Sequence, residues 1–320
     1  MKAAVVREFG ARPTWEEFPS PVAEPGEVIV GVTAAAVNPI VLSLASGAHY
    51  SGHAVLPFIP GVDGAGRTSD GRRLYFRDLR SPYGALAEQA PVTASRAVPI
   101  PDGVTDVAAA VAGIPGASCW MPLTRLAPIR PGESVLVNGA TGAAGRMAVQ
   151  VARHLGAREV VATGRDPSGL AELAPLGVNF RLSLLDPAEE LRDTVRRLAK
   201  ELSIGVVLDY LWGPSAQVLL TALGGPGAPR GSSRVRYVSI GALAGDTSPV
   251  ASRLLRSSGL EILGSGIGSA TEDEIIAGTR EFLGALATEK FRLDVEERPL
   301  SRVGENWGRT GGAKRLVFTA

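Results

Sequence analysis

Three glycines in the stretch 133–157 have a spacing that suits a phosphate-binding turn. The stretch reads ESVLVNGATGAAGRMAVQVARHLGA, with an apolar run before the glycines and an apolar helical pattern after them. Glycines let the backbone approach a pyrophosphate, and the following helix N-terminus offers N–H donors and the positive end of its dipole. The spacing is G-x-x-G-x-x-G, and glycine-rich turns also occur without a ligand, but the flanking strand and helix favour a dinucleotide site. The residues expected to line it are Gly139, Thr141, Gly142, Ala143, Ala144 and Gly145.

The end of the next strand pattern carries residues that distinguish the two nicotinamide dinucleotides. An NAD site usually has Asp or Glu here, about 20 residues past the glycines, to bind the ribose 2′-hydroxyl. This chain has Gly164, which opens space, and Arg165, whose planar cation suits a 2′-phosphate. Asp166 comes one or two places late for the NAD role. We therefore predict NADP(H); the alternative is a solvated loop arginine that pairs with Asp166.

From residue 134 onward, strand patterns alternate with helical ones. The strand patterns cover 134–139, 160–164, 181–184, 206–211, 235–240 and 262–265. The helical patterns cover 146–155, 169–176, 188–202, 215–223 and 250–257. This alternation predicts a parallel sheet with crossover helices, and six strands make a complete doubly wound nucleotide domain.

The two ends of the chain have a different texture. Short β-rich runs broken by proline and glycine fill the first third, which favours a partly open barrel over a helical bundle. The tail after residue 271 predicts a helix over 274–287 and a final strand, Arg315–Thr319. It has too little apolar volume for a third domain, so we expect it to return to the first one.

Composition narrows the classes of protein that fit. The length of 320 residues suggests about two domains, and the net charge of +1 argues against bulk attraction to nucleic acid or anionic membrane. Cys119 is the only cysteine, which fits a reducing compartment. The N-terminus lacks the apolar core of a secretory signal, and we find no apolar run long enough to span a bilayer. We expect a cytoplasmic protein with no membrane or nucleic-acid partner.

Four motifs in order along the chain carry a family resemblance. They are AAVNPI at 35–40, PFIPGVDGAG at 57–66, GIP at 113–115 and PGESVLVNGATGAAG at 131–145. On these motifs the chain resembles the medium-chain dehydrogenase/reductase superfamily, specifically its zinc-independent quinone oxidoreductase branch of zeta-crystallin-like proteins. The resemblance covers nearly the whole chain. It departs from the family between Gly66 and Leu74, where the usual long hairpin is cut to RTSDGRR and one rim of the barrel is altered.

The resemblance implies an α/β architecture in which a Rossmann domain interrupts a GroES-like, partly open β-barrel catalytic domain. The implied boundaries are 1–112 for the first catalytic segment, 113–266 for the Rossmann domain and 267–320 for the return segment. The implied activity is NADPH-dependent, zinc-independent transfer of a hydride to a quinone, enone or other polarised double bond. Many relatives form homodimers through the edge of the last Rossmann strand, here 262–265.

The resemblance also assigns residues around the nicotinamide. Asn38 and Tyr50 would act as catalytic residues, with the Tyr50 hydroxyl as a hydrogen-bond or proton donor. The alternatives are that Asn38 caps a turn and that Tyr50 is an ordinary loop residue. Ser118 would contact the ring or cap a helix. The further cofactor contacts, which also follow from the rule that ligands lie beyond carboxyl strand ends, are Gly241, Ala242, Leu243, Ser265 and Gly266.

We predict no metal ion. Catalytic zinc needs three ligands of Cys, His, Asp or Glu type. In zinc-dependent relatives these ligands stand at AAVNPI, at Val62 and Asp63, and near Ile114, and no matching set occurs here. Two other functions stay open: a non-catalytic NADP(H)-binding regulatory or scaffold protein, and a zinc-free alcohol or imine oxidoreductase. The cluster Arg72, Arg73, Arg77 and Arg80 is read as a solvated face rather than a site for an acidic partner.

Overall fold

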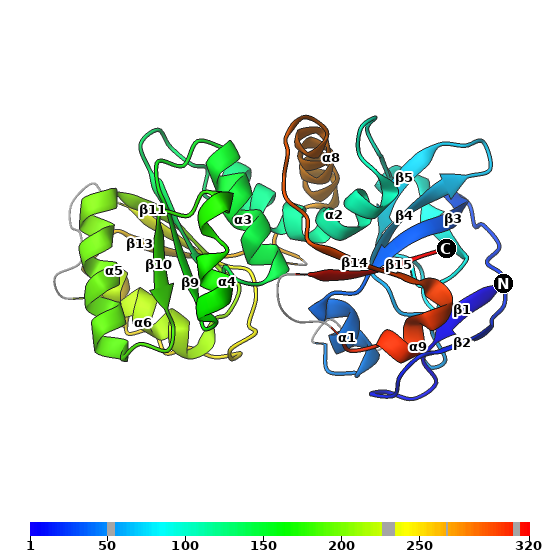
Figure 1. Ribbon diagram of the computed structural model, residues 1–320, viewed down its shortest axis with the longest axis horizontal. Coiled ribbons are helices and arrows are strands. Elements are labelled where there is room, and N and C mark those ends of the chain that lie inside the picture. The colour runs from blue at the N-terminus through cyan, green and yellow to red at the C-terminus, as the bar shows by residue number, and fades with distance from the viewer. Residues whose placement is uncertain (50–54, 226–233, 267, 310–313) are drawn as a thin grey trace. The chain divides into compact units, whose positions relative to one another are not determined.

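The computed structural model describes residues 1–49, 55–225, 234–266, 268–309 and 314–320. The chain divides into two compact units, which Figure 1 shows in their sequence colours. Unit 1 consists of Met1–Ile114 together with Glu272–Ala320, and unit 2 is Pro115–Thr271.

Unit 2 is built on a six-stranded sheet in the order β10-β9-β8-β11-β12-β13. All five strand pairs are parallel. The predicted doubly wound sheet is therefore confirmed. Its strands are β8 (Ser134–Asn138), β9 (Val160–Gly164), β10 (Phe180–Ser183), β11 (Ile204–Asp209), β12 (Val235–Ser239) and β13 (Leu260–Gly264).

Helices cover both faces of this sheet, as continuous apolar strands require. Helices α5 and α6 lie along one face and α3 and α4 along the other (Figure 1). Buried leucines of α5 and α6 pack with strand residues such as Leu136 and Val207 in one core cluster. The helices of unit 2 are α3 (Ala143–His154), α4 (Pro167–Ala171), α5 (Ala188–Leu202), α6 (Gly213–Gly224) and α7 (Ser252–Arg256), with a 3-10 turn at Ala174–Leu176.

Unit 1 holds a mixed sheet in the order β14-β15-β3-β4-β5-β7, with β6 paired to β3, and a separate β1-β2 pair. Strand β15 pairs with β3, so residues from the two ends of the chain share one sheet. The strands are β1 (Lys2–Val5), β2 (Thr14–Glu17), β3 (Glu27–Ala36), β4 (Asp63–Thr68), β5 (Arg73–Arg77), β6 (Gln89–Thr93), β7 (Val98–Pro99), β14 (Val295–Pro299) and β15 (Arg315–Thr319). The helices are α1 (Pro39–Ala45), α8 (Glu272–Thr288) and α9 (Val303–Asn306), with 3-10 turns at Ala94–Arg96 and Leu300–Arg302.

A long apolar helix connects the first segment of unit 1 to unit 2. Helix α2 (Asp106–Met121) continues into a π-helical turn at Pro122–Leu126. The whole span Asp106–Leu126 has 21 residues and is long and apolar enough, by length and composition alone, to cross a membrane, which corrects the expectation that no such run exists. Because 67% of its apolar window is buried inside the protein, we interpret it as a core helix.

Strand β4 carries a buried carboxyl group. Asp63 is fully buried, and Tyr75 on β5 donates a hydrogen bond from its hydroxyl to Asp63 Oδ2 (2.8 Å). A Cβ built on Gly113 of α2 would lie 2.3 Å from the Tyr75 ring, so only glycine lets the helix approach this tyrosine. Burial raises the pKa of Asp63 to about 7, although the Tyr75 hydrogen bond and the charges of Arg315 and Arg77 oppose the rise.

We expect this carboxyl group to make the free energy of unfolding depend on pH. The unfolded chain holds Asp63 at an ordinary pKa of 3.8 and the folded protein at about 7. Between these values the folded state keeps a proton that the unfolded state has lost, so stability falls as pH rises from about 4 and levels off above about 7. In Asp63→Asn this fall should be absent, as urea denaturation at pH 5 and pH 8 would measure. The exposed Asp102→Asn is the control, and an Asp63→Asn protein with the wild-type slope would contradict the expectation.

Candidate functional site

The glycine turn after β8 is shaped by close backbone packing. Gly139 has a φ of +89°, a conformation that glycine adopts readily. A Cβ built on Gly145 would lie 2.3 Å from the carbonyl oxygen of Gly139, so the start of α3 can meet the turn only without a side chain. Gly142 differs, because it has an ordinary φ of −77° and a Cβ built there meets nothing within 4 Å. Protein packing therefore explains Gly145 but not Gly142.

The N-terminus of α3 faces this turn. The Arg146 N–H donates to Gly142 O (2.9 Å) and closes the first helical turn, which leaves the N–H groups of 143–145 ahead of the hydrogen-bonded ladder. No side chain caps this end of the helix at Gly142. These N–H groups and the helix dipole make the position suitable for an anion.

Arg146 braces the turn, a role that the sequence analysis did not give it. Its Nε donates to Thr141 O (3.1 Å), and its guanidinium contacts Glu172 Oε2 (2.6 Å). Only 4% of the residue is exposed. Arg146 directly follows the third glycine of the motif, and this position is the feature of the sequence from which its contact with the turn could have been predicted.

The end of β9 packs against the same turn. A Cβ built on Gly164 would lie 2.6 Å from Thr141 Cγ2, so this glycine is required by the contact. Arg165 is exposed and comes next in the chain. Asp166 is engaged elsewhere, because its carboxylate accepts hydrogen bonds from the backbone N–H groups of Ser168 and Gly169 and caps α4. Within the described ranges, no ion pair joins Arg165 to Asp166.

The segments after β12 and β13 reach the same carboxyl edge of the sheet. The N–H of Gly241 donates to Asp209 O (3.1 Å), and a Cβ built on Gly241 would lie 2.8 Å from Tyr210 O. Ala242 and Leu243 are exposed, Leu243 by 68%. Ser265 N donates to Ser239 O (2.8 Å) and Gly266 N to Ser269 Oγ (2.8 Å).

Ser118 lies within helix α2 rather than at a helix end. Its hydroxyl donates to Pro115 O (2.7 Å) and lies 3.4 Å from the Tyr210 hydroxyl. Burial raises the pKa of Tyr210 well above its ordinary value, so this hydroxyl stays protonated at neutral pH. The neighbouring Cys119 is fully buried, and burial raises the pKa of its thiol. Such a thiol is a packing residue rather than a nucleophile.

The two predicted catalytic residues belong to unit 1. Asn38 is buried, and its Oδ1 accepts a hydrogen bond from Val41 N (3.1 Å) as the N-cap of α1. Tyr50 lies outside the described residues. Among the residues that the structure describes, no group of three or more His, Cys, Asp or Glu side chains is arranged to hold a metal ion.

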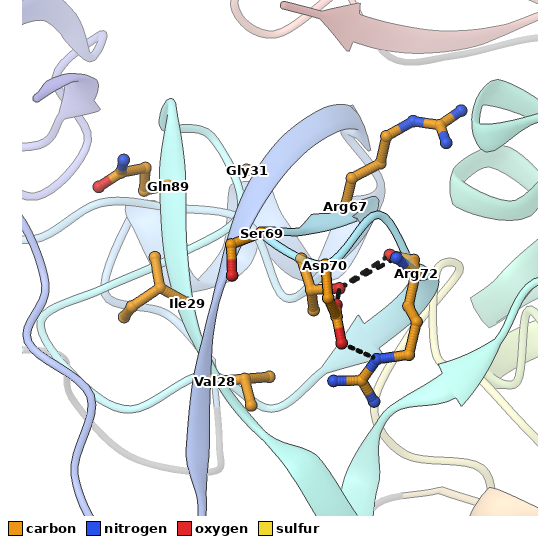
Figure 2. Close-up of a pocket in the computed structure, with 9 residues that line it drawn as sticks. Val28, Ile29, Gly31, Arg67, Ser69, Asp70, Arg72 and Gln89 are labelled. Atoms are coloured by element: carbon orange, nitrogen blue, oxygen red, sulfur yellow. Dashed lines mark hydrogen bonds and ion pairs between the residues drawn. The ribbon is translucent and has the colours of Figure 1, made fainter.

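A groove of about 600 Å³ lies beside the shortened hairpin of unit 1, and its described lining includes no predicted site residue. Figure 2 shows Arg72 turned toward Asp70, with Nε to Oδ2 at 2.8 Å. Arg67 also lines the groove, and its Nη2 lies 3.8 Å from Oδ2 of Asp106. The other arginines of the basic cluster also contact acidic side chains. This pairing argues against a site for an acidic partner, but the side chains of Arg73 and Arg77 are only 22% and 19% exposed, so the cluster is not a solvated face throughout.

Sequence comparison links the whole chain to a reductase. It is 28% identical over 350 residues to a protein of Emericella nidulans described as a "Probable NADPH-dependent quinone reductase", and the match covers 96% of each chain. A polyketide synthase of Mycobacterium tuberculosis, described as mycocerosic acid synthase-like, is 30% identical over 210 residues. The matched region is 63% of this chain but only 10% of that synthase. No family model matches the chain.

Solved structures show the same fold over the full chain. A mycobacterial quinone oxidoreductase superposes with a TM-score of 0.86 at 23% identity, covering 100% of both chains. The quinone oxidoreductase of Thermus thermophilus, also solved in complex with NADPH, superposes with a TM-score of 0.78 at 28% identity and the same coverage. With the doubly wound sheet, the separate mixed sheet and the glycine turn described above, the chain is similar over its whole length to quinone oxidoreductases in fold, and in sequence at 28% identity.

Proposed function

We propose that this protein transfers a hydride from NADPH to a small quinone, enone or other polarised double bond. The observation that carries the proposal is Gly142, whose missing side chain leaves open space at the N-terminus of α3 although packing does not require a glycine there. The protein is an oxidoreductase that uses NADP(H). Its similarity to a protein described as an NADPH-dependent quinone reductase, and to structures solved in complex with NADPH, supports this statement. The class of acceptor is the part of the proposal that experiment must decide.

The residues of unit 2 fit a phosphorylated dinucleotide. The N–H groups of 143–145 begin a helix of 12 residues and suit a pyrophosphate. Arg165 is exposed one residue beyond Gly164, where its planar cation suits a 2′-phosphate. When bound, the nicotinamide supplies the hydride. We propose that Ser118, the segment 241–243, Ser265 and Gly266 line its ring.

Asn38 and Tyr50 are the residues that we propose to polarise the acceptor. Hydride transfer to a quinone or enone leaves negative charge on an oxygen atom, and fixed hydrogen-bond donors stabilise that charge. Oδ1 of Asn38 already accepts the N-cap hydrogen bond of α1, so we propose that Nδ2 donates to the oxygen of the acceptor. The Tyr50 hydroxyl would supply a second hydrogen bond or the proton.

Several wider features belong to the same proposal. Unit 1 would be the catalytic domain and unit 2 the Rossmann domain, with Asn38 and Tyr50 in place of a zinc ion. Elemental analysis of chelator-washed protein would test for zinc. The protein would act in the cytoplasm as a homodimer that pairs the β13 edge, because β13 ends the order of the six-stranded sheet. A monomer in light scattering would contradict the dimer.

Stopped-flow oxidation of NADPH against a panel of quinones, enones and imines would test the function. We expect turnover with a quinone or an enone, and unchanged turnover after chelation of metals. Tight NADPH binding with no turnover on any acceptor would contradict the proposed activity and favour the non-catalytic alternative. Turnover of alcohols with NADP⁺, but not of quinones or enones with NADPH, would favour the alcohol oxidoreductase.

A further inference from the structure

A fully buried carboxylate lies at the carboxyl end of β11. Asp209 is 0% exposed. Its Oδ1 accepts hydrogen bonds from Asn138 Nδ2 (2.7 Å), Leu211 N (2.8 Å) and Trp212 N (3.1 Å). Its Oδ2 accepts one from the Tyr237 hydroxyl (2.6 Å). Four neutral donors therefore converge on this side chain, and a buried acceptor with so many donors orders the groups around it.

This carboxylate belongs to a polar chain that links four neighbouring strands just below the glycine turn. Thr163 on β9 donates to Asn138 Oδ1 on β8 (2.6 Å), and the Gly139 N–H donates to Thr163 Oγ1 (3.2 Å). Asn138 then donates to Asp209 on β11, which accepts from Tyr237 on β12. The first residue of the glycine turn is thus connected by hydrogen bonds to the segment that follows β11.

The segment after β11 also touches the glycine turn directly. A Cβ built on Gly139 would lie 2.9 Å from Leu211 Cγ, so the Leu211 side chain occupies the space beside that glycine. The N–H of Leu211 is one of the groups that Asp209 holds. The position of the leucine on the turn therefore depends on the carboxylate.

Trp212 shows that this segment is strained. Its φ is +55° with a ψ of −150°, a conformation that residues with side chains rarely adopt. Such conformations persist only where surrounding contacts fix them, and they gather at ligand sites. Here Asp209 Oδ1 accepts from the Trp212 N–H, and the indole packs edge to face on Tyr237, with ring centroids 6.2 Å apart. Asp209 therefore holds the strained residue directly, through the Trp212 N–H, and indirectly, through Tyr237.

We propose that Asp209 is a positioning residue that sets the geometry of the pyrophosphate and nicotinamide half of the cofactor site, by fixing Leu211 and Trp212 against the glycine turn. The inference rests on the proposed function. It predicts a much smaller influence of Asp209 on the adenosine half, which would bind at Gly164 and Arg165, because Asp209 is linked to β9 through two intervening side chains.

The effect of Asp209 on each half can be measured separately with two ligands. NADPH occupies the whole site, and adenosine 2′-monophosphate, which lacks the 5′-phosphate, occupies only the adenosine half. In Asp209→Ala we expect the NADPH dissociation constant to rise at least about tenfold while that of the monophosphate stays within about twofold of wild type. A purely structural role would weaken both ligands together or neither.

The conservative variant Asp209→Asn provides the rescue. Its amide oxygen can take the place of Oδ1 and keep the three bonds to Asn138, Leu211 and Trp212, while its NH₂ group faces the Tyr237 hydroxyl. NADPH affinity should then return to within about threefold of wild type. Equal losses in Asp209→Asn and Asp209→Ala would overturn the positioning role, because the charge and not the framework would then matter.

Hydrogen exchange in the wild-type protein covers the case in which Asp209→Ala does not fold. We expect NADPH, but not adenosine 2′-monophosphate, to slow exchange in a peptide that spans 209–213. Exchange there that is unaffected by NADPH would overturn the inference, as would an Asp209→Ala protein with wild-type NADPH affinity. Wild-type protein that binds no NADPH would instead refute the proposed function, and this inference with it.

Discussion

Replacement of Gly142 by alanine is expected to raise the dissociation constant of NADPH at least about 100-fold without lowering the melting temperature. The added Cβ meets no protein atom within 4 Å, and the φ of −77° suits alanine, so the fold accepts it. The added methyl group stands one residue before the N–H groups of 143–145, which we propose as the pyrophosphate site, and we expect it to crowd the phosphates there. Loss of two hydrogen bonds to a charged group, at about 1.5–3 kcal/mol each, gives this magnitude.

Two further glycine variants make the result specific. Gly145→Ala should lower both NADPH affinity and stability, because its Cβ would lie 2.3 Å from the Gly139 carbonyl oxygen. Gly284→Ala, in α8 of unit 1 with open space around the new Cβ, should raise stability by up to about 1 kcal/mol and leave NADPH affinity unchanged. Calorimetric titration and thermal unfolding of the three proteins would measure both properties. Wild-type NADPH affinity in Gly142→Ala would contradict the assigned turn.

Replacement of Arg165 by alanine should remove the preference for NADPH over NADH. Charge-assisted hydrogen bonds from a guanidinium to a phosphate contribute about 1.5–3 kcal/mol, so NADPH affinity should fall about 10- to 100-fold. Affinity for NADH, which has no 2′-phosphate, should change little. Arg165 is free to take this role because Asp166 caps α4 instead of pairing with it. Dissociation constants for both cofactors, measured by NAD(P)H fluorescence, would show the change.

Arg181 gives a matched control for charge. It is an exposed arginine on β10, the strand next to β9, so Arg181→Ala changes the net charge by the same amount. We expect its cofactor preference to equal that of wild type. An Arg165→Ala protein that still prefers NADPH would contradict the assignment of the 2′-phosphate site.

Sequence patterns predict the parallel sheet well because its strands β8, β9 and β11 are buried at every position and are therefore mostly apolar. Local pattern does not predict strand β4, because DGAGRT contains no β-branched residue before its final threonine and forms through its neighbours. A Cβ on Gly66 would lie 2.3 Å from Gly31 O, so the strand pairs where small residues let β3 come close. Local pattern does not predict helix α2 either, because it contains Pro115 and two glycines, which disfavour a helix, and tertiary burial stabilises it.

Some residues of the candidate site can be predicted from local sequence patterns and others cannot. The glycine turn and Arg165 are local features that sequence spacing can reveal. The hydrogen bond from Asn138 to Asp209 joins residues 71 positions apart, and the one from Tyr237 to Asp209 joins residues 28 apart. No local pattern encodes such pairs, because each partner looks ordinary in its own strand. Likewise, the ion pair of Arg146 with Glu172 depends on how two helices pack.

The pairing of β15 with β3 has a consequence for synthesis of the protein. The ribosome synthesises all of unit 2 before it makes β15, which lies next to β3 in the unit 1 sheet. The sheet of unit 2 can therefore form co-translationally, while the 34–36 end of β3 stays without the partner strand that is translated more than 280 positions later. During that interval the exposed strand edge of the nascent chain is open to chaperones and to aggregation.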